Sequence, residues 1–127
     1  MEFIPELPFD NNSAQNAVWL AIKQSLQAEE GLAYYRYPLY RMDGVMRHEP
    51  DIMLVLRKYG IFVIECKGFG INNIESIQGN VWQMKDWYRE LEQPLAQASD
   101  QMFAVKNYLD REPSLINIIR FHWRDLR

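Results

Sequence analysis

The chain has 127 residues, of which 48% are hydrophobic and 13% aromatic, and it carries a formal net charge of −3. This length suits a domain with one hydrophobic core, and the composition excludes an intrinsically disordered protein. The modest acidity argues against a strongly basic protein that coats nucleic acid.

The single cysteine, Cys66, excludes an internal disulfide and any zinc or iron–sulfur site built on several cysteines. It lies in an apolar segment and is expected to face a hydrophobic core. No signal peptide is evident, and no apolar stretch is long and uninterrupted enough to cross a membrane. We therefore expect a cytoplasmic protein without a membrane partner.

The N-terminal part is expected to form an irregular stretch followed by one helix. Pro5 and Pro8 interrupt the first ten residues, and Asn12 with its polar neighbours can cap a helix over residues 13–28. Apolar residues recur in this segment with a helical period, which places Gln15 on the side that faces the sheet.

The middle of the chain is expected to form three strands. An aromatic-rich strand over residues 32–41 is followed by an Asp-Gly turn signal at residues 43–44. The next strand covers residues 46–56 or starts one residue earlier, and it is bent near Pro50. The third strand covers residues 61–67.

A second hairpin is expected over residues 74–78 and 81–85, around a Gly-Asn turn. Trp82, Trp87 and Tyr88 gather beside it. Two interpretations of these aromatic residues stay open, namely packing in a core and stacking on nucleobases.

The closing helix is expected to begin near Pro94, since proline suits the first turn of a helix. Gln97 and Gln101 are four residues apart and share one helical face. They are either polar residues at the boundary of an apolar stripe or part of a functional site. Residues 114–121 are apolar enough for a late strand or helix.

Three ionisable residues lie on the central strands, which are otherwise strongly apolar. Asp51 begins one strand, and Glu65 and Lys67 lie two residues apart on the next. Charged groups in such strands need partners, because an unpaired charge is costly to bury. Two carboxylates suit a hard cation such as Mg²⁺, and an adjacent lysine suits a water or a phosphate oxygen. A solvated edge pair is the alternative interpretation of Glu65 and Lys67.

The strand register decides whether these three side chains meet. Residues two apart in a strand face the same side. If residues 58–60 form a three-residue loop, Arg57 pairs with Ile61 and Asp51 falls opposite Lys67. A two-residue loop would instead turn Asp51 to the other face.

These motifs carry a resemblance to a known family. Pro50-Asp51, thirteen further residues and then Glu65-Cys66-Lys67 resemble the motif of the PD-(D/E)XK nuclease superfamily. The order of helix, hairpin strands and closing Pro-x-x-Gln-x-x-x-Gln helix resembles, more narrowly, the nuclease-related domain (NERD) over roughly residues 8–110.

The resemblance implies a metal-dependent DNA nuclease that hydrolyses phosphodiester bonds. It implies that Asp51, Glu65 and the backbone carbonyl of Cys66 bind Mg²⁺ or Mn²⁺, with Lys67 as a catalytic group. Gln15, Gln97 and Gln101 are then supporting residues. The resemblance also implies DNA as partner, a role in DNA repair, and fusion to a helicase or another DNA-processing module.

Gln15 departs from the family pattern, which often has an acid on the first helix. A glutamine can still ligate a hard cation through its carbonyl oxygen, but it contributes no negative charge. A second function therefore stays open, namely a catalytically degenerate nuclease fold that regulates through binding nucleic acid or protein.

Together, the elements predict an α/β fold with a restriction-endonuclease-like core, in which helices flank a mixed, mostly antiparallel sheet. We expect a single nuclease-related domain over residues 1–127, with its core at about residues 8–110. The untidy end of the sequence suggests that this domain is the N-terminal part of a longer protein.

Overall fold

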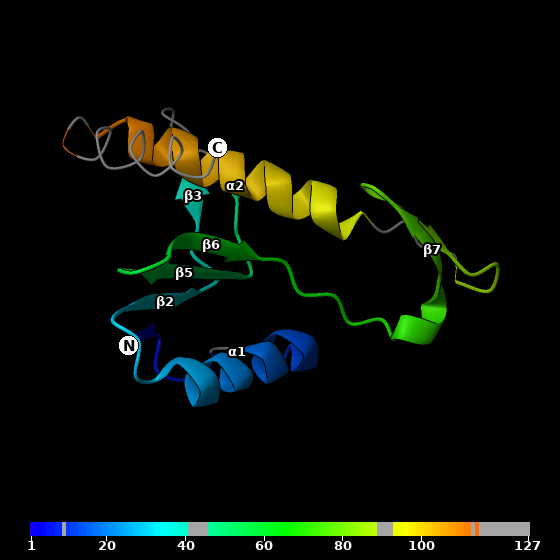
Figure 1. Ribbon diagram of the computed structural model, residues 1–127, viewed down its shortest axis with the longest axis horizontal. Helices are drawn as coiled ribbons and strands as arrows, with labels where there is room; N and C mark the ends of the chain where they lie inside the picture. Colours follow the sequence, from blue (N-terminus) through cyan, green and yellow to red (C-terminus); the bar gives the residue numbers. More distant parts are fainter. Residues whose placement is uncertain (9, 41–45, 89–92, 113, 115–127) are drawn as a thin grey trace.

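The computed structural model describes residues 1–8, 10–40, 46–88, 93–112 and 114. It has a sheet between two helices, and Figure 1 shows α1 on one face and α2 on the other. The elements in chain order are β1 (Glu2–Ile4), α1 (Ser13–Leu26), β2 (Gly31–Tyr35), β3 (Leu39–Tyr40), β4 (Met46–His48), β5 (Ile52–Leu56), β6 (Gly60–Ile64), a 3₁₀ turn (Ile71–Asn73), β7 (Ile74–Gln78), β8 (Val81–Met84) and α2 (Pro94–Asp110).

The central sheet has the order β1-β2-β5-β6. β1 pairs with β2 in parallel, whereas the β2–β5 and β5–β6 pairs are antiparallel. The predicted α/β fold with a mixed, mostly antiparallel sheet is therefore confirmed. The expectation that the N-terminal stretch is irregular was wrong, because the three residues before Pro5 form β1 and make main-chain hydrogen bonds to β2.

The β5–β6 hairpin has a three-residue loop, but it lies one residue earlier than expected. Leu56 pairs with Gly60, and Ile52 pairs with Ile64. The predicted pairing of Arg57 with Ile61 was wrong because Gly60, with φ of 95°, already belongs to the ladder. The shift moves the register by two positions, so the same side chains stay on the same faces.

The aromatic-rich segment forms two short strands where one was expected. Arg36 separates β2 from β3 and has a φ of 53°, in the left-handed region that side-chain-bearing residues rarely adopt. Its main-chain N–H donates to the main-chain carbonyl of Asp51 at 2.9 Å. The expected bend near Pro50 is found between β4 and β5, which occupy different sheets.

Each helix covers its own hydrophobic cluster. On the α1 side, Trp19 is fully buried against the sheet residues Ile52 and Leu54. On the α2 side, Val105 packs with Met53 and with Leu39 of β3. Alternate residues of β5 thus enter opposite clusters, as strand geometry requires. A buried aliphatic or aromatic side chain contributes roughly 1.5–3 kcal/mol.

The helix ends follow their sequence signals. The side chain of Asn12 accepts a hydrogen bond from the main-chain N–H of Gln15 at 3.0 Å and caps α1. α1 ends two residues earlier than predicted. α2 begins at Pro94, as the sequence indicated.

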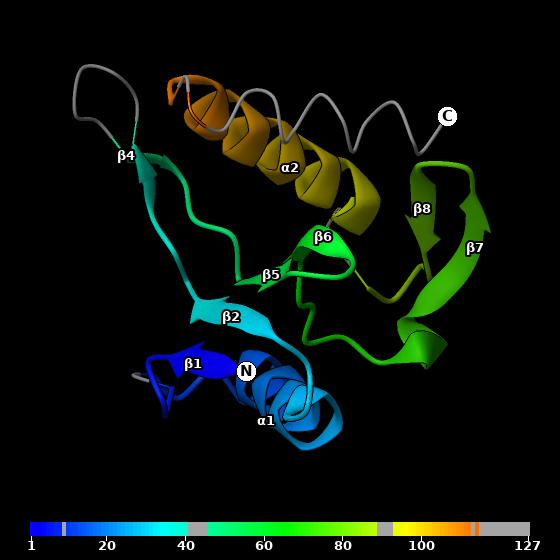
Figure 2. The same ribbon diagram turned by 60° about the vertical axis from the view of Figure 1, so that its left-hand side comes forward.

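The β7–β8 hairpin forms a separate two-stranded sheet at the end of the molecule where β6 leaves the central sheet. Figures 1 and 2 show it near the start of α2. Phe69 packs edge-on against Trp82 and Tyr88, with ring centroids 6.1 and 5.9 Å apart. Trp87 is 64% exposed and does not share this packing. The Asp-Gly turn at residues 43–44 and most of the apolar segment 114–121 lie outside the described residues.

Gly31 is required by the close approach of β2 and β5. A Cβ atom there would overlap the carbonyl oxygen of Val55, whereas one at Gly68 would meet only the Cβ of Ala14 at 3.9 Å. We predict that Gly31→Ala lowers the free energy of unfolding by about 1–3 kcal/mol, since backbone strands must move apart. Urea unfolding would measure this. Equal effects of Gly31→Ala and the control Gly68→Ala would contradict it.

Candidate active site

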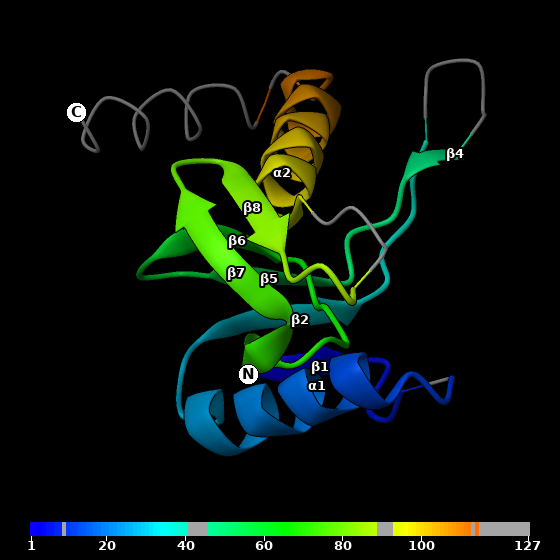
Figure 3. The same ribbon diagram turned by 90° about the vertical axis from the view of Figure 1, so that its right-hand side faces the viewer.

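The ionisable residues of the central strands gather at one end of the sheet, where β5 begins and β6 ends. The N-terminal part of α1 and the N-terminal half of α2 reach the same end from opposite faces. Figure 3 looks toward this end, with the β7–β8 hairpin standing in front of the sheet. The site is therefore built from four segments that are far apart in the sequence.

Asp51 precedes β5 and is half-buried. Its Oδ1 accepts a hydrogen bond from Gln15 Nε2 at 2.7 Å, and its Oδ2 accepts one from the main-chain N–H of Cys66 at 2.8 Å. Burial raises the pKa of this carboxyl, and the nearby carboxylate of Glu65 adds to the increase. The N–H of Cys66 and the ammonium of Lys67 oppose it. The hydrogen bonds thus hold the carboxyl in place, although its surroundings disfavour the ionised form.

Glu65 and Lys67 lie just beyond the end of β6 and form an ion pair, with Oε1 and Nζ 3.2 Å apart. Their side chains are only 11% and 21% exposed. The interpretation as a solvated edge pair was therefore wrong. Glu65 Oε2 also accepts a hydrogen bond from Gln101 Nε2 of α2 at 3.0 Å. Gln101 Oε1 is buried and has no hydrogen-bond partner among the described residues.

Gln15 on α1 reaches the site, as its helical position predicted. Its side chain is 9% exposed and lies between Asp51 and Tyr35, whose hydroxyl is 3.2 Å from Gln15 Oε1. The same hydroxyl donates to Asp10 Oδ1 at 2.7 Å. Burial, followed by this hydrogen bond to Asp10, raises the pKa of Tyr35. The phenol therefore stays protonated.

Asp10 and Arg36 form a second layer that sequence reasoning missed. The guanidinium of Arg36 bonds Asp10 Oδ2 at 2.5 Å and Glu49 Oε1 at 2.6 Å. The Tyr35 hydroxyl, the Asn12 N–H and Arg36 lower the pKa of Asp10. The sequence did contain an indication of them, since the polar groups of Tyr35 and Arg36 come at the end of an otherwise apolar segment. Their partners could not be read from the sequence because they come from other segments.

Gln97, one of the expected supporting residues, does not join this cluster. The Gln97 side chain is exposed, and no described hydrogen bond links it to Asp51 or Glu65. His48 lies in β4 and lines a groove of about 540 Å³ between α2 and the β3–β4 pair, which none of the three ionisable strand residues lines. Cys66 packs against the α1-side cluster, as expected, and burial raises the pKa of its thiol to about 11.

The donor set suits a hard divalent cation with few charged ligands. Asp51 and Glu65 provide carboxylate oxygens. Gln101 Oε1, which is buried without a hydrogen-bond partner in the described part of the chain, adds a neutral oxygen of the kind such ions accept. Among the described residues there is no group of three His, Cys, Asp or Glu residues that could hold a metal ion. The residues therefore fit a cation bound by two carboxylates and completed by neutral oxygens.

The sandwiched sheet and its acid–acid–lysine cluster define a restriction-endonuclease-like nuclease fold. The chain also matches the family model described as NERD, nuclease-related domain, over residues 11–122. The chain belongs to this family, and the family suggests a nuclease-related function and use of a divalent metal. No curated protein and no solved structure gave a match. In the described part of the chain, no helix is long and apolar enough to span a bilayer.

The raised pKa of Asp51 predicts a stability change with pH. Above the ordinary value of 3.8, the unfolded state loses its proton first, so ionisation disfavours the folded state until pH exceeds the higher folded pKa. We predict that Asp51→Asn, without metal, gains stability relative to wild type as pH rises through this window and then levels off. Urea unfolding in EDTA between about pH 3.5 and pH 7 tests this.

The exposed Asp86 supplies a matched control for this measurement. Asp86→Asn removes the same ionisable group from a solvated position. A stability difference between Asp51→Asn and wild type that does not change with pH would contradict the prediction. The same would follow if both variants gave the same pH dependence.

Proposed function

We propose that this domain is a Mg²⁺- or Mn²⁺-dependent nuclease that hydrolyses phosphodiester bonds in DNA. One observation carries the proposal: in a member of the nuclease-related family, two carboxylates and a lysine of low exposure meet at one end of the sheet. Structural ion pairs rarely need two carboxylates in mutual contact, because their repulsion must be offset.

In this mechanism Asp51 and Glu65 would hold the cation, and the backbone carbonyl of Cys66 and neutral amide oxygens would complete its surroundings. A divalent cation held there would supply Lewis acidity toward the phosphate and make a nearby water more acidic. The protein's part is to fix the two carboxylates. Before a cation binds, Gln15 and the Cys66 N–H hold Asp51, and Gln101 holds Glu65.

Lys67 acts on the reacting groups. Its ammonium is 3.2 Å from Glu65 Oε1, so its position is set by one of the carboxylates that hold the cation. From there it donates a hydrogen bond to the attacking water or to the phosphate oxygen that gains charge in the transition state. Such a preorganised donor contributes about 100- to 1000-fold in rate.

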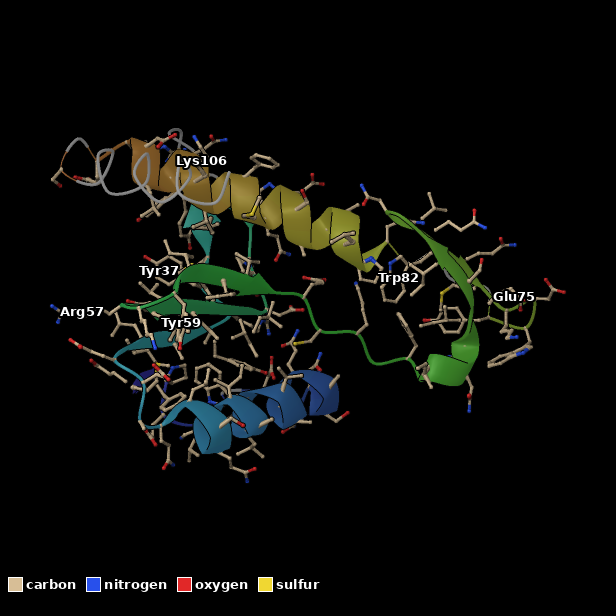
Figure 4. The ribbon with its side chains drawn as sticks, in the orientation of Figure 1. Tyr37, Arg57, Tyr59, Glu75, Trp82 and Lys106 are labelled. Atoms are coloured by element: carbon tan, nitrogen blue, oxygen red, sulfur yellow. The ribbon has the colours of Figure 1, made fainter. Side chains whose placement is uncertain are left out.

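We predict that Lys67→Ala and Glu65→Ala each reduce DNA cleavage by at least about 100-fold. Labelled single- and double-stranded DNA would be incubated with Mg²⁺, Mn²⁺ or EDTA and analysed on denaturing gels. Lys58→Ala and Glu30→Ala are matched controls at the opposite end of the sheet, where Figure 4 labels Arg57 and Tyr59. If the site variants cleave DNA as fast as wild type and the controls, the assigned site is wrong.

A second candidate function is a catalytically degenerate nuclease fold that binds nucleic acid or protein and regulates an attached module. The observation in its favour is the amide of Gln15 at the place of an acid, where it already donates to Asp51. This reading predicts that Mg²⁺ leaves the thermal unfolding temperature unchanged, since no cation binds the folded state. Fusion to a helicase and a role in DNA repair extend the nuclease proposal and rest on the resemblance alone. A cytoplasmic location is a separate proposal, which rests on the sequence analysis.

A further inference from the structure

We propose that Tyr35 is a positioning residue that decides which end of the Gln15 amide faces the metal-binding carboxylates. When a cation binds, the Gln15 carbonyl oxygen turns toward Asp51 and its NH₂ group donates to the Tyr35 hydroxyl oxygen. This inference rests on the proposed function, because it concerns the same cation site. It explains how a glutamine can occupy the place of an acid without ending cation binding.

The hydrogen atoms around Tyr35 carry the argument. Its hydroxyl lies 2.7 Å from Asp10 Oδ1, 3.0 Å from Asn16 Oδ1 and 3.2 Å from Gln15 Oε1. A phenol has one proton to donate. The carboxylate of Asp10 is the strongest of these acceptors and the closest, so it takes the proton. Two amide oxygens then face the lone pairs of the Tyr35 oxygen.

The two amides differ in what holds them. Asn16 Nδ2 donates to the main-chain carbonyl of Asp10 at 3.2 Å, which keeps the Asn16 oxygen toward Tyr35. Gln15 Nε2 instead donates to Asp51 Oδ1 at 2.7 Å. The group that fixes the Gln15 amide is therefore the carboxylate that a cation would engage.

A cation at Asp51 reverses the preference of this amide. The NH₂ group would then point its positive end at the cation, whereas the carbonyl oxygen is a suitable ligand. A half-turn about the bond between Cγ and Cδ exchanges the two ends with little change in shape. Nε2 then donates to the Tyr35 oxygen, which in turn donates to Asp10. Both donors in this chain, Gln15 Nε2 and the Tyr35 hydroxyl, then have an acceptor.

Because Gln15 and Tyr35 are buried, the loss of one hydrogen bond between them should have a measurable effect. Tyr35 is 3% exposed and Gln15 is 9% exposed, so water does not readily replace a missing partner. The charge of Asp10 also acts on Gln15 through the phenol, since each bond in a chain polarises the next. Asp10 thus supports from a distance the oxygen that stands in for the absent acid.

The test is a double-mutant cycle on Mn²⁺ affinity, measured by electron paramagnetic resonance of free Mn²⁺ on the whole chain. We predict that Tyr35→Phe weakens Mn²⁺ binding about three- to tenfold, the value of one buried hydrogen bond. In a Gln15→Glu background the same change has no effect, because a carboxylate presents an oxygen in either orientation. Tyr37→Phe is the matched control, because its hydroxyl bonds Tyr108 of α2.

A spectroscopic measurement reports the turn of the amide itself. In nuclear magnetic resonance spectra, the Gln15 side-chain NH₂ protons should gain a nuclear Overhauser contact with the Tyr35 ring when diamagnetic Mg²⁺ is added. This contact is absent in Tyr35→Phe if the hydroxyl oxygen is the acceptor. Thermal unfolding of each variant confirms that the fold is intact, since phenylalanine keeps the edge-on packing against Trp19.

The outcomes separate the inference from the proposed function. Equal weakening by Tyr35→Phe in both backgrounds, or no weakening in either, overturns the role of Tyr35 and leaves the nuclease proposal standing. Absence of Mn²⁺ binding by the folded wild type overturns both, because neither survives without a cation. If Lys67→Ala loses DNA cleavage but Tyr35→Phe weakens Mn²⁺ binding equally in both backgrounds, the nuclease proposal stands and only the role of Tyr35 is overturned.

Discussion

The pairing of β5 with β6 is the interaction on which the site depends. The ladder runs from Leu56 and Gly60 at the turn to Ile52 and Ile64, and the next residues outward are Asp51 and Glu65. An even shift of register keeps both carboxylates on their faces, whereas an odd shift would separate them. The apolar residues enforce this choice, because Met53 enters one cluster while Ile52 and Leu54 enter the other. Core packing thus positions the acids.

Two carboxylates brought together out of water need donors, and the helices provide them. α1 brings Gln15 to Asp51, and α2 brings Gln101 to Glu65. Each donor is a neutral amide, so each holds a carboxylate without neutralising it, and Lys67 is the nearby cation. Burial is the main cause of the raised pKa of Asp51, and the charge of Glu65, which these groups offset only in part, adds to it. Such residual negative charge is what a divalent cation would relieve.

The bend at Arg36 connects the fold to this chemistry. Its left-handed backbone ends β2, and its N–H holds the carbonyl of Asp51. Its side chain ties Glu49, two residues before Asp51, to Asp10. A backbone conformation of this kind costs about 1–3 kcal/mol and persists only when the surroundings enforce it. Here the contacts that hold Arg36 in this conformation also fix the segment that carries Asp51, so the strained backbone helps to position one carboxylate.

The sequence by itself predicted most of the local elements, and it predicted that Asp51, Glu65, Lys67, Gln15 and Gln101 lie near one another, because strand alternation, helical periodicity and motif spacing are local properties. It misplaced the hairpin loop by one residue and gave no sign of β1, whose parallel pairing with β2 joins segments 30 residues apart, as Glu2 opposite Leu32 illustrates. Only the tertiary structure separated Gln101, which contacts Glu65, from the exposed Gln97 on the same helical face. Only it brought Asp10, Tyr35 and Arg36 behind the site. Contacts between distant segments depend on how the layers pack, and that packing has no local pattern in the chain.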